Sequence, residues 1–297
     1  MKKIMQWSVA ILLVVASISV ASYPFFSNYF NSKNTDEKVV QYLDYVAKPP
    51  ANRYQSIINN AREYNKKLIQ NPVKFSDPFL DGENAPKDYY SQLSSDEIDV
   101  MATLSIPRID VNLPVYHGTS DEVLKKGVGH LSSSSLPVGG FGSHSVLSAH
   151  TGSSSLKLFS DLNCLAINDI FYINCFGERM AYQVNQIKTV LPDDDTYIKI
   201  DPKKDYVTLV TCTPFGVNTH RLLVRGVRVD LEEAEKLTKN VNTAKSTWNS
   251  EYFNAILLGI GVMLAILLVY VLLRRVVRIC KNLKRKRIAT EESKIDE

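Results

Sequence analysis

The residues best suited to chemistry lie in the stretch "TLVTCTPFGVNTHRLLVRG", residues 208–226. Cys212 ends an apolar, β-branched run, and Arg221 follows nine residues later. A free thiol with a pKa of about 8.5 is only slightly ionised at neutral pH, so a nucleophilic cysteine needs a basic or cationic partner. From these residues alone, Cys212 is either a core thiol at a strand end or a nucleophile.

A histidine is the natural base, and the chain has five. His150 ends the run "HSVLSAH" and precedes the small-residue loop "TGSSS", which predicts an imidazole at a strand terminus. Taken alone, His150 is either structural or catalytic. The other four are expected to be structural: His117 and His130 in glycine-flanked turns, His144 in a partly exposed turn before a strand, and His220 on the strand face opposite its neighbour Arg221.

Together these residues predict a site for acyl transfer. In a β-barrel, two strand ends can bring His150 and Cys212 together across 62 residues, and Arg221 returns on the next strand. The thiol would attack, and the imidazole would activate it or protonate the leaving amine. The guanidinium is a permanent cation with a fork of donors, suited to an oxyanion or to the substrate backbone.

The elements that must position these groups change in character along the chain. From Met101 onward, short β runs broken by proline and glycine predict an all-β barrel or sandwich, with Pro107 and Pro114 interrupting strands. Residues 36–70 are predicted to be helical, with an apolar face formed by Tyr54, Ile57, Ile58, Ala61, Tyr64 and Leu68. The stretch 71–99 has no sustained period, and a loop of this length is a candidate lid.

The two ends of the chain predict where the middle works. Residues 4–21 are almost wholly apolar, and residues 255–273 form nineteen uncharged residues, enough to cross a bilayer as a helix. Eight Lys or Arg follow within residues 274–287, which places that tail in the cytoplasm and the middle of the chain outside. The small residues "SVAS" at 19–22 leave cleavage and retention of the first segment equally open.

Composition limits the remaining function classes. Residues 23–250 hold 24 Lys or Arg against 26 Asp or Glu, so no nucleic-acid role follows from the overall charge of +4. Cys164 and Cys175 are either bridged or two buried free thiols, and three cysteines do not make a disulfide framework. Cys and His show no metal-ligand spacing, and the acidic run 193–195 is either a solvated loop or a calcium ligand set.

The motifs resemble those of sortases, the transpeptidases of Gram-positive cell envelopes. "TLVTC" with Arg221 nine residues on is similar to their active-site strand, and "LPVYHG", "GVGHL", "SLPVGG" and "HSVLSAHTG" match in order and content, from Leu104 to Val229. The resemblance implies a mainly β fold, a closed barrel of about eight strands, with His150, Cys212 and Arg221 as catalytic residues and no cofactor.

Three further features resemble the class C, pilin-polymerising branch: the second membrane segment, the helical N-terminal extension and the sequence "DPF". In that branch a lid carries an acid that faces the catalytic arginine and an aromatic ring that covers the cysteine. The resemblance therefore implies a lid formed by Asp77, Pro78 and Phe79. Without it, Asp-Pro indicates an ordinary turn.

The resemblance implies a reaction and its partners. Cys212 would attack the threonine carbonyl of an LPXTG-like sorting signal on a pilin, and a lysine of the next pilin would resolve the thioacyl-enzyme as an isopeptide. The alternatives are a sortase that anchors proteins to peptidoglycan, a related hydrolase, and a membrane-anchored scaffold without chemistry. A papain-like protease is disfavoured because the cysteine follows the histidine and no motif of that family is present.

These inferences predict seven regions: a signal or anchor segment 1–22, a helical extension 23–70, a lid region 71–99, the catalytic barrel 100–235, a polar connector 236–254, a transmembrane helix 255–273 and a basic cytoplasmic tail 274–297.

Overall fold

The structure is a computed structural model that describes residues 2–48, 54–70, 77–79, 85–153, 155–239 and 241–292. Parts of the predicted lid region, residues 71–76 and 80–84, lie outside the described residues, as do the last five residues of the predicted tail. The chain divides into two compact units, one up to Trp248 and one from Asn249 onward.

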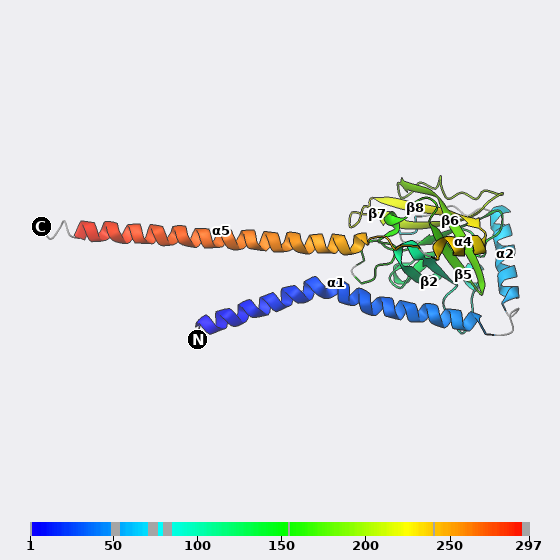
Figure 1. Cartoon of the computed structure of the whole chain (residues 1–297). Helices are drawn as coiled ribbons and strands as arrows, with labels where there is room; N and C mark the ends of the chain where they lie inside the picture. Colours follow the sequence, from blue (N-terminus) through cyan, green and yellow to red (C-terminus); the bar gives the residue numbers. More distant parts are fainter. Residues whose placement is uncertain are drawn as a thin grey trace. The chain divides into compact units, whose positions relative to one another are not determined.

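Eight strands form a closed barrel in the order β1-β2-β3-β4-β7-β8-β6-β5, which confirms the predicted mainly β fold. Figure 1 shows the strands of the barrel, with β2, β5, β6, β7 and β8 labelled. Two neighbouring pairs, β2 with β3 and β4 with β7, are parallel, and the others are antiparallel. The strands are β1 (Ala102–Ile106), β2 (Val111–His117), β3 (Val128–His130), β4 (Ser143–Ser148), β5 (Ile170–Cys175), β6 (Glu178–Val190), β7 (Asp205–Thr213) and β8 (His220–Val229).

Alternate side chains of the strands belong to two different apolar clusters. On β7, Val207 and Leu209 belong to the main core, whereas Val210 belongs to a second, smaller cluster. Successive side chains of a strand point to opposite faces of the sheet. The two clusters therefore lie on the inner and outer faces of the same strand, and both faces near its end are covered.

Proline interrupts the strands at only one of the two predicted places. Pro107 opens a 3₁₀ turn, η2 (Pro107–Ile109), between β1 and β2, as expected. Pro114 instead lies inside β2, opposite Thr103. The prediction was wrong there because β3 pairs with β2 only from Val115 onward, so the missing N–H of Pro114 removes no ladder bond on that side.

Two helices precede the barrel. Helix α1 (Lys2–Val46) runs through the predicted boundary at residue 22 with Pro24 inside it, and α2 (Gln55–Gln70) follows. The predicted stripe of α2 is confirmed, since Ile58, Ala61, Tyr64 and Leu68 are buried. The α2 residue Asn65 exchanges two hydrogen bonds with the backbone of Leu136, which attaches α2 to the barrel.

The predicted polar connector is partly helical. Helix α4 (Leu231–Thr238) begins at Asp230, whose side chain accepts a hydrogen bond from the Glu233 N–H, and α5 (Thr247–Glu292) begins within the connector. Among the described residues, the stretch Thr247–Ile279 is long and apolar enough to cross a membrane. Several side chains of residues 4–21 lie outside the described ones, so the N-terminal span stays a prediction.

The region predicted as a long lid is partly built into the barrel. The short 3₁₀ turn η1 (Tyr89–Ser91) and Leu93 are anchored, with Tyr89 and Leu93 in the main core. The hydroxyl of Tyr89 donates to the backbone O of His130 (3.0 Å) and accepts from the Gly118 N–H (2.9 Å). Residues 89–93 therefore belong to the scaffold.

Candidate active site

The strand register places His150, Cys212 and Arg221 in one row. Strands β4 and β7 pair in parallel at a constant offset of 62 residues, as in Ser148 opposite Val210. The pairing extends past the end of β4, because the Thr211 hydroxyl donates to the Ala149 carbonyl at 2.7 Å. The same offset sets His150 level with Cys212, and Arg221 is the cross-strand partner of Cys212 on β8.

The row lies on the outer face of the barrel. Cys212 shares its face of β7 with Val210, and Arg221 shares its face of β8 with Leu223. Val210 and Leu223 belong to the smaller apolar cluster, against which Phe79, Tyr197 and Ile198 also pack. The thiol is only 8% exposed. The site is therefore an apolar outer surface covered by side chains from two other segments.

Asp77 and Arg221 form a buried, bidentate ion pair. Arg221 donates from Nε to Asp77 Oδ1 (2.9 Å) and from Nη2 to Asp77 Oδ2 (2.5 Å). The exposed fractions of the two side chains are only 8% and 2%. The remaining nitrogen, Nη1, donates to the carbonyls of Asn218 and His220, so the guanidinium is fixed from both sides.

Phe79 lies against groups on both sides of the cysteine. Its ring is 5.1 Å from Cζ of Arg221 and its centroid is 5.8 Å from that of the His150 ring. The Phe79 N–H also donates to Asp77 Oδ1 at 3.3 Å, which fixes the two residues relative to one another. The predicted segment Asp77–Phe79 therefore contacts the arginine and the histidine of the row together.

The surroundings keep the thiol protonated. Burial raises the pKa of Cys212, the Arg221 guanidinium lowers it, and the Asp77 carboxylate raises it again, with a raised pKa as the result. A positive partner stabilises a thiolate, and a carboxylate paired with that partner cancels part of the effect. The Asp77 carboxylate therefore weakens the electrostatic help that Arg221 gives the thiol.

A carboxylate that sequence reasoning missed lies beside the histidine. Asp121 opens the short helix α3 (Asp121–Leu124), and its Oδ1 is 3.7 Å from Nε2 of His150. It also bonds Lys125, one turn further on. Burial lowers the pKa of His150, while Asp121 partly restores it. The sequence marks Asp121 only as the first residue after the helix cap Ser120, a pattern that carries no information about His150.

These pKa shifts disfavour the reactive charge state, in which Cys212 is a thiolate and His150 an imidazolium. Ordinary values for cysteine and histidine leave a thiolate–imidazolium pair in about one molecule in a hundred. Burial moves the pKa of Cys212 up and that of His150 down, so the covered site holds still less of this pair. The arrangement has the groups that acyl transfer needs, in a covered state of low reactivity.

Two of the other histidines, His130 and His144, are buried and hydrogen-bonded. His130 is fully buried between the Tyr89 hydroxyl and the Ser135 carbonyl, and burial lowers its pKa to about 4. His144 was predicted to be partly exposed, which is wrong: it is a buried residue of β4, bonded to Thr208 Oγ1 (2.7 Å) and the Lys199 carbonyl (2.9 Å). The His144 ring lies among Thr208 and Tyr206 of β7 and the backbone at Lys199, contacts that sequence periodicity does not reveal.

Three cysteines of the described residues, Cys164, Cys175 and Cys212, are free thiols, so Cys164 and Cys175 are not bridged. Cys175 is buried, whereas Cys164 is partly exposed. The same described residues contain no cluster of three or more side chains able to hold a metal ion.

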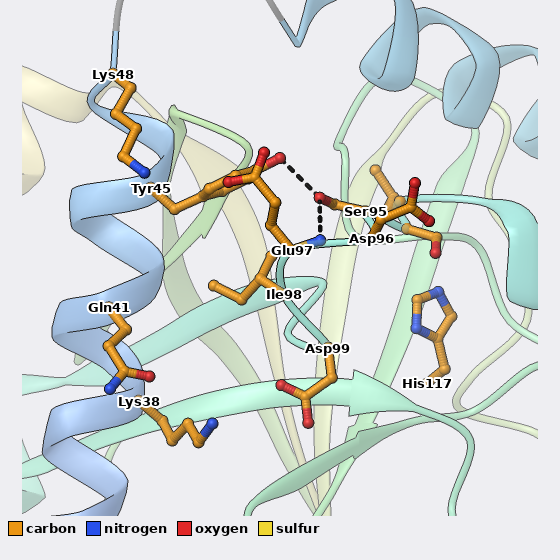
Figure 2. A pocket seen from close by; sticks show the side chains of 12 residues that line it. Lys38, Gln41, Tyr45, Lys48, Ser95, Asp96, Glu97, Ile98, Asp99 and His117 are labelled. Atoms are coloured by element: carbon orange, nitrogen blue, oxygen red, sulfur yellow. Dashed lines mark hydrogen bonds between the residues drawn. The ribbon is translucent and has the colours of Figure 1, made fainter.

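A pocket of about 760 Å³ has none of the residues of this row in its lining. Figure 2 shows the side chains that line it. Lys38 of α1, Lys48 just after that helix and the acids of residues 96–99 line it. Tyr45 and Ser95 share a hydrogen bond of 2.7 Å. His117 borders the pocket, but its Nε2 bonds the Gln92 carbonyl at 2.7 Å. None of the residues proposed for chemistry lines this pocket.

Comparisons with known proteins identify the family of this chain. Residues 104–229 match the sortase domain. Sortase A of Bacillus anthracis is 26% identical over 223 residues, 73% of this chain and 91% of that protein. The crystal structure of sortase C1 from Streptococcus agalactiae is 48% identical, with a TM-score of 0.59, and covers 65% of this chain and 97% of that one. Sortase C of Streptococcus pneumoniae is 37% identical, with a TM-score of 0.60 and the same coverage.

The chain belongs to the sortase family of cysteine transpeptidases. Its structural relatives include class C sortases of Streptococcus and Actinomyces, in agreement with the class C resemblance of its sequence.

Proposed function

We propose that the protein is a pilus-assembling transpeptidase. The Cys212 thiol passes its proton to His150 as the sulfur attacks the threonine carbonyl of an LPXTG-like sorting signal. The Thr–Gly bond then breaks, and His150 gives that proton to the departing glycine amine. A lysine amine of the next pilin then attacks the thioester carbon. The carbon–sulfur bond breaks and an isopeptide bond forms. The proton lost by the lysine amine passes through His150 to the Cys212 sulfur.

The observation that carries the proposal is the row of His150, Cys212 and Arg221 on one outer face, covered by Asp77 and Phe79. A thiol, an acid–base group and a forked cation at one level are the groups that acyl transfer requires. Arg221 stabilises the oxyanion or holds the substrate backbone. It can do so only after Asp77 releases it, because both guanidinium edges are occupied.

The segment Asp77–Phe79 acts as a lid. While it is closed, the apparent affinity for a sorting signal is reduced by the fraction of molecules that are open. Opening removes the Asp77 charge from the site, which lowers the pKa of Cys212 because that charge raises it. Substrate access and thiol activation therefore rise together.

Relatives support the pilus role. The sortase C of Streptococcus pneumoniae is described in terms of its pilin substrate specificity, and a sortase C1 of the group B streptococcal pilus island 1 is 36% identical to this chain. The peptidoglycan-anchoring alternative draws support from the sortase A proteins among the relatives. The two functions differ in the acceptor amine.

The membrane segments fit substrates that are themselves tethered. The helix Thr247–Ile279 would anchor the enzyme, with the basic residues beyond it in the cytoplasm and the barrel outside. Enzyme and pilins on one membrane surface meet at high effective concentration.

The acceptor is the decisive test of this function. The full chain in detergent micelles is incubated with an LPXTG-type peptide and pilin, lysine-blocked pilin, or a peptidoglycan-stem amine. We expect an isopeptide product with pilin only, lost on lysine blocking and in Cys212→Ala, and retained in Cys164→Ala. A Cys212-dependent product only with the stem amine would favour cell-wall anchoring. Activity that survives Cys212→Ala would refute the transpeptidase mechanism.

A further inference from the structure

The loop that follows His150 is held by residues outside the barrel. It leaves the strand region at His150, whose carbonyl accepts a hydrogen bond from the Phe159 N–H at 3.1 Å. Gly152 has a φ of +72°, a left-handed conformation that favours glycine, and its N–H donates to Ser160 Oγ at 3.1 Å. The described residues of this loop, 151–153 and 155–158, therefore have a defined backbone.

Helix α1 provides two of the contacts. Asn31 donates from Nδ2 to the Ser155 carbonyl at 2.9 Å, and Asn28 accepts from the Lys157 N–H at 2.8 Å. The two asparagines are three residues apart, so they lie on one face of the helix. Both contacts are made to backbone groups, which fixes the course of the loop whatever its side chains are.

Trp248 provides a third contact from the other end of the chain. Its indole Nε1 donates to the Ser153 carbonyl at 3.1 Å, and the residue is 1% exposed. Its ring meets the ring of Phe25, on α1, edge-on at 5.7 Å. Phe25 lies three residues before Asn28 and so continues the same face of α1.

The start of α5 is fixed at Trp248 by a buried carboxylate. Asp161 accepts hydrogen bonds from the N–H groups of Thr247 (2.9 Å) and Trp248 (3.0 Å), and it pairs with Lys157 at 2.8 Å. Burial alone would raise the pKa of Asp161, but these donors lower it overall. Asp161 therefore ties Trp248 to Lys157, at the end of the same loop.

Among the described residues, the ion-pair and ring partners of the His150 side chain are the largely exposed Asp121 and the ring of Phe79 in the lid. The His150 side chain is 31% exposed. When the lid opens, Phe79 departs and the orientation of the imidazole depends mainly on the backbone at the start of the loop. A displacement of about 1 Å at such a group can cost on the order of 10²-fold in rate.

We propose that Phe25, Asn28, Asn31 and Trp248 form a loop clamp that positions His150 for proton transfer. The inference rests on the proposed acid–base function of His150. The clamp residues all lie outside the matched sortase domain, residues 104–229. They belong to α1 and α5, the two helices that contain the apolar segments near the ends of the chain. They act through the loop and touch no reacting atom.

The test uses three variants of the full chain in detergent micelles. Asn31→Leu removes one clamp donor, and Trp248→Phe keeps an aromatic ring but removes the indole N–H. Asn34→Leu is the matched control, because Asn34 lies on the same helix and is exposed. For each variant, kcat, KM and the pH profile are measured with an LPXTG-type peptide, together with alkylation of Cys212 by a small thiol reagent and Tm.

We expect kcat to fall roughly tenfold in Asn31→Leu and in Trp248→Phe, with KM and alkylation within about twofold of wild type. The acid limb of the pH profile should shift in these variants and stay fixed in Asn34→Leu. Wild-type kcat in both clamp variants would overturn the clamp proposal and leave the proposed function standing. A fall in kcat accompanied by a lower Tm and faster alkylation of the buried Cys212 would show general destabilisation and overturn it as well. A wild-type chain without Cys212-dependent turnover would refute the proposed function itself.

Discussion

Replacing His150 with alanine is expected to lower kcat/KM for a sorting-signal peptide by about 10²- to 10⁴-fold, the usual contribution of a positioned acid–base group. The thiol would lose the group that accepts its proton and returns one to the leaving amine. His220→Ala is the matched control, since its ring bonds the Thr219 hydroxyl. Activity of His150→Ala within threefold of wild type would contradict the assignment.

The pH dependence of kcat/KM tests the role of His150 a second way, because the direction of its pKa shift predicts where the acid limb lies. Because burial lowers the pKa of His150 below its ordinary 6.5, the imidazole is neutral at pH 7, and the acid limb of kcat/KM should lie below pH 6.5. Asp121 raises the pKa of His150, so Asp121→Asn should move that limb to still lower pH. The limb should vanish in His150→Ala. A shift to higher pH in Asp121→Asn would be inconsistent with the observed geometry.

Replacing Arg221 with alanine is expected to lower kcat by about 10²- to 10³-fold, as when an oxyanion donor is lost. Arg221→Lys should recover only part of the rate, because an ammonium cannot reproduce the two-edged fork that binds Asp77, Asn218 and His220. Arg221→Ala also leaves the buried Asp77 carboxylate without its cation, which destabilises the closed lid.

Two further variants, Arg225→Ala and Asp77→Ala, separate the catalytic role of Arg221 from its role in closing the lid. Arg225→Ala lies on the same face of β8, where Arg225 stacks on Tyr206 and bonds Asn185, and it should keep near-wild-type kcat. Asp77→Ala and Arg221→Ala both break the ion pair but should change turnover in opposite directions. Equal kcat in Arg221→Ala and Arg225→Ala would remove Arg221 from the mechanism.

The sequence predicts the elements and the row of site residues because both depend on local pattern and on register. The strand run "HSVLSAH", the run that ends at Cys212 and the short return to Arg221 are visible locally, and β4 and β7 bring them level. The stripe of α2 is likewise a local period of 3.6.

What the sequence did not predict depends on contacts between distant segments. Asp121 reaches His150, and Trp248 reaches the Ser153 carbonyl, only after the barrel closes. The same holds for His144, whose burial follows from the strand beside it. Helix α1 continues through residue 22 with Pro24 inside it, where composition suggested a boundary. Periodicity reports which face is apolar and carries no information about which partner covers it.

The central claim is that Cys212 is the nucleophile and that Asp77 and Phe79 control access to it. Intact-mass measurement of the full chain and of Asp77→Ala after incubation with an LPXTG-type peptide tests it directly. We predict a thioacyl adduct on Cys212 that forms faster in Asp77→Ala, persists when Cys164→Ala is added and disappears when Cys212→Ala is added. No adduct on Cys212 in Asp77→Ala, or an adduct that survives Cys212→Ala, would contradict the claim.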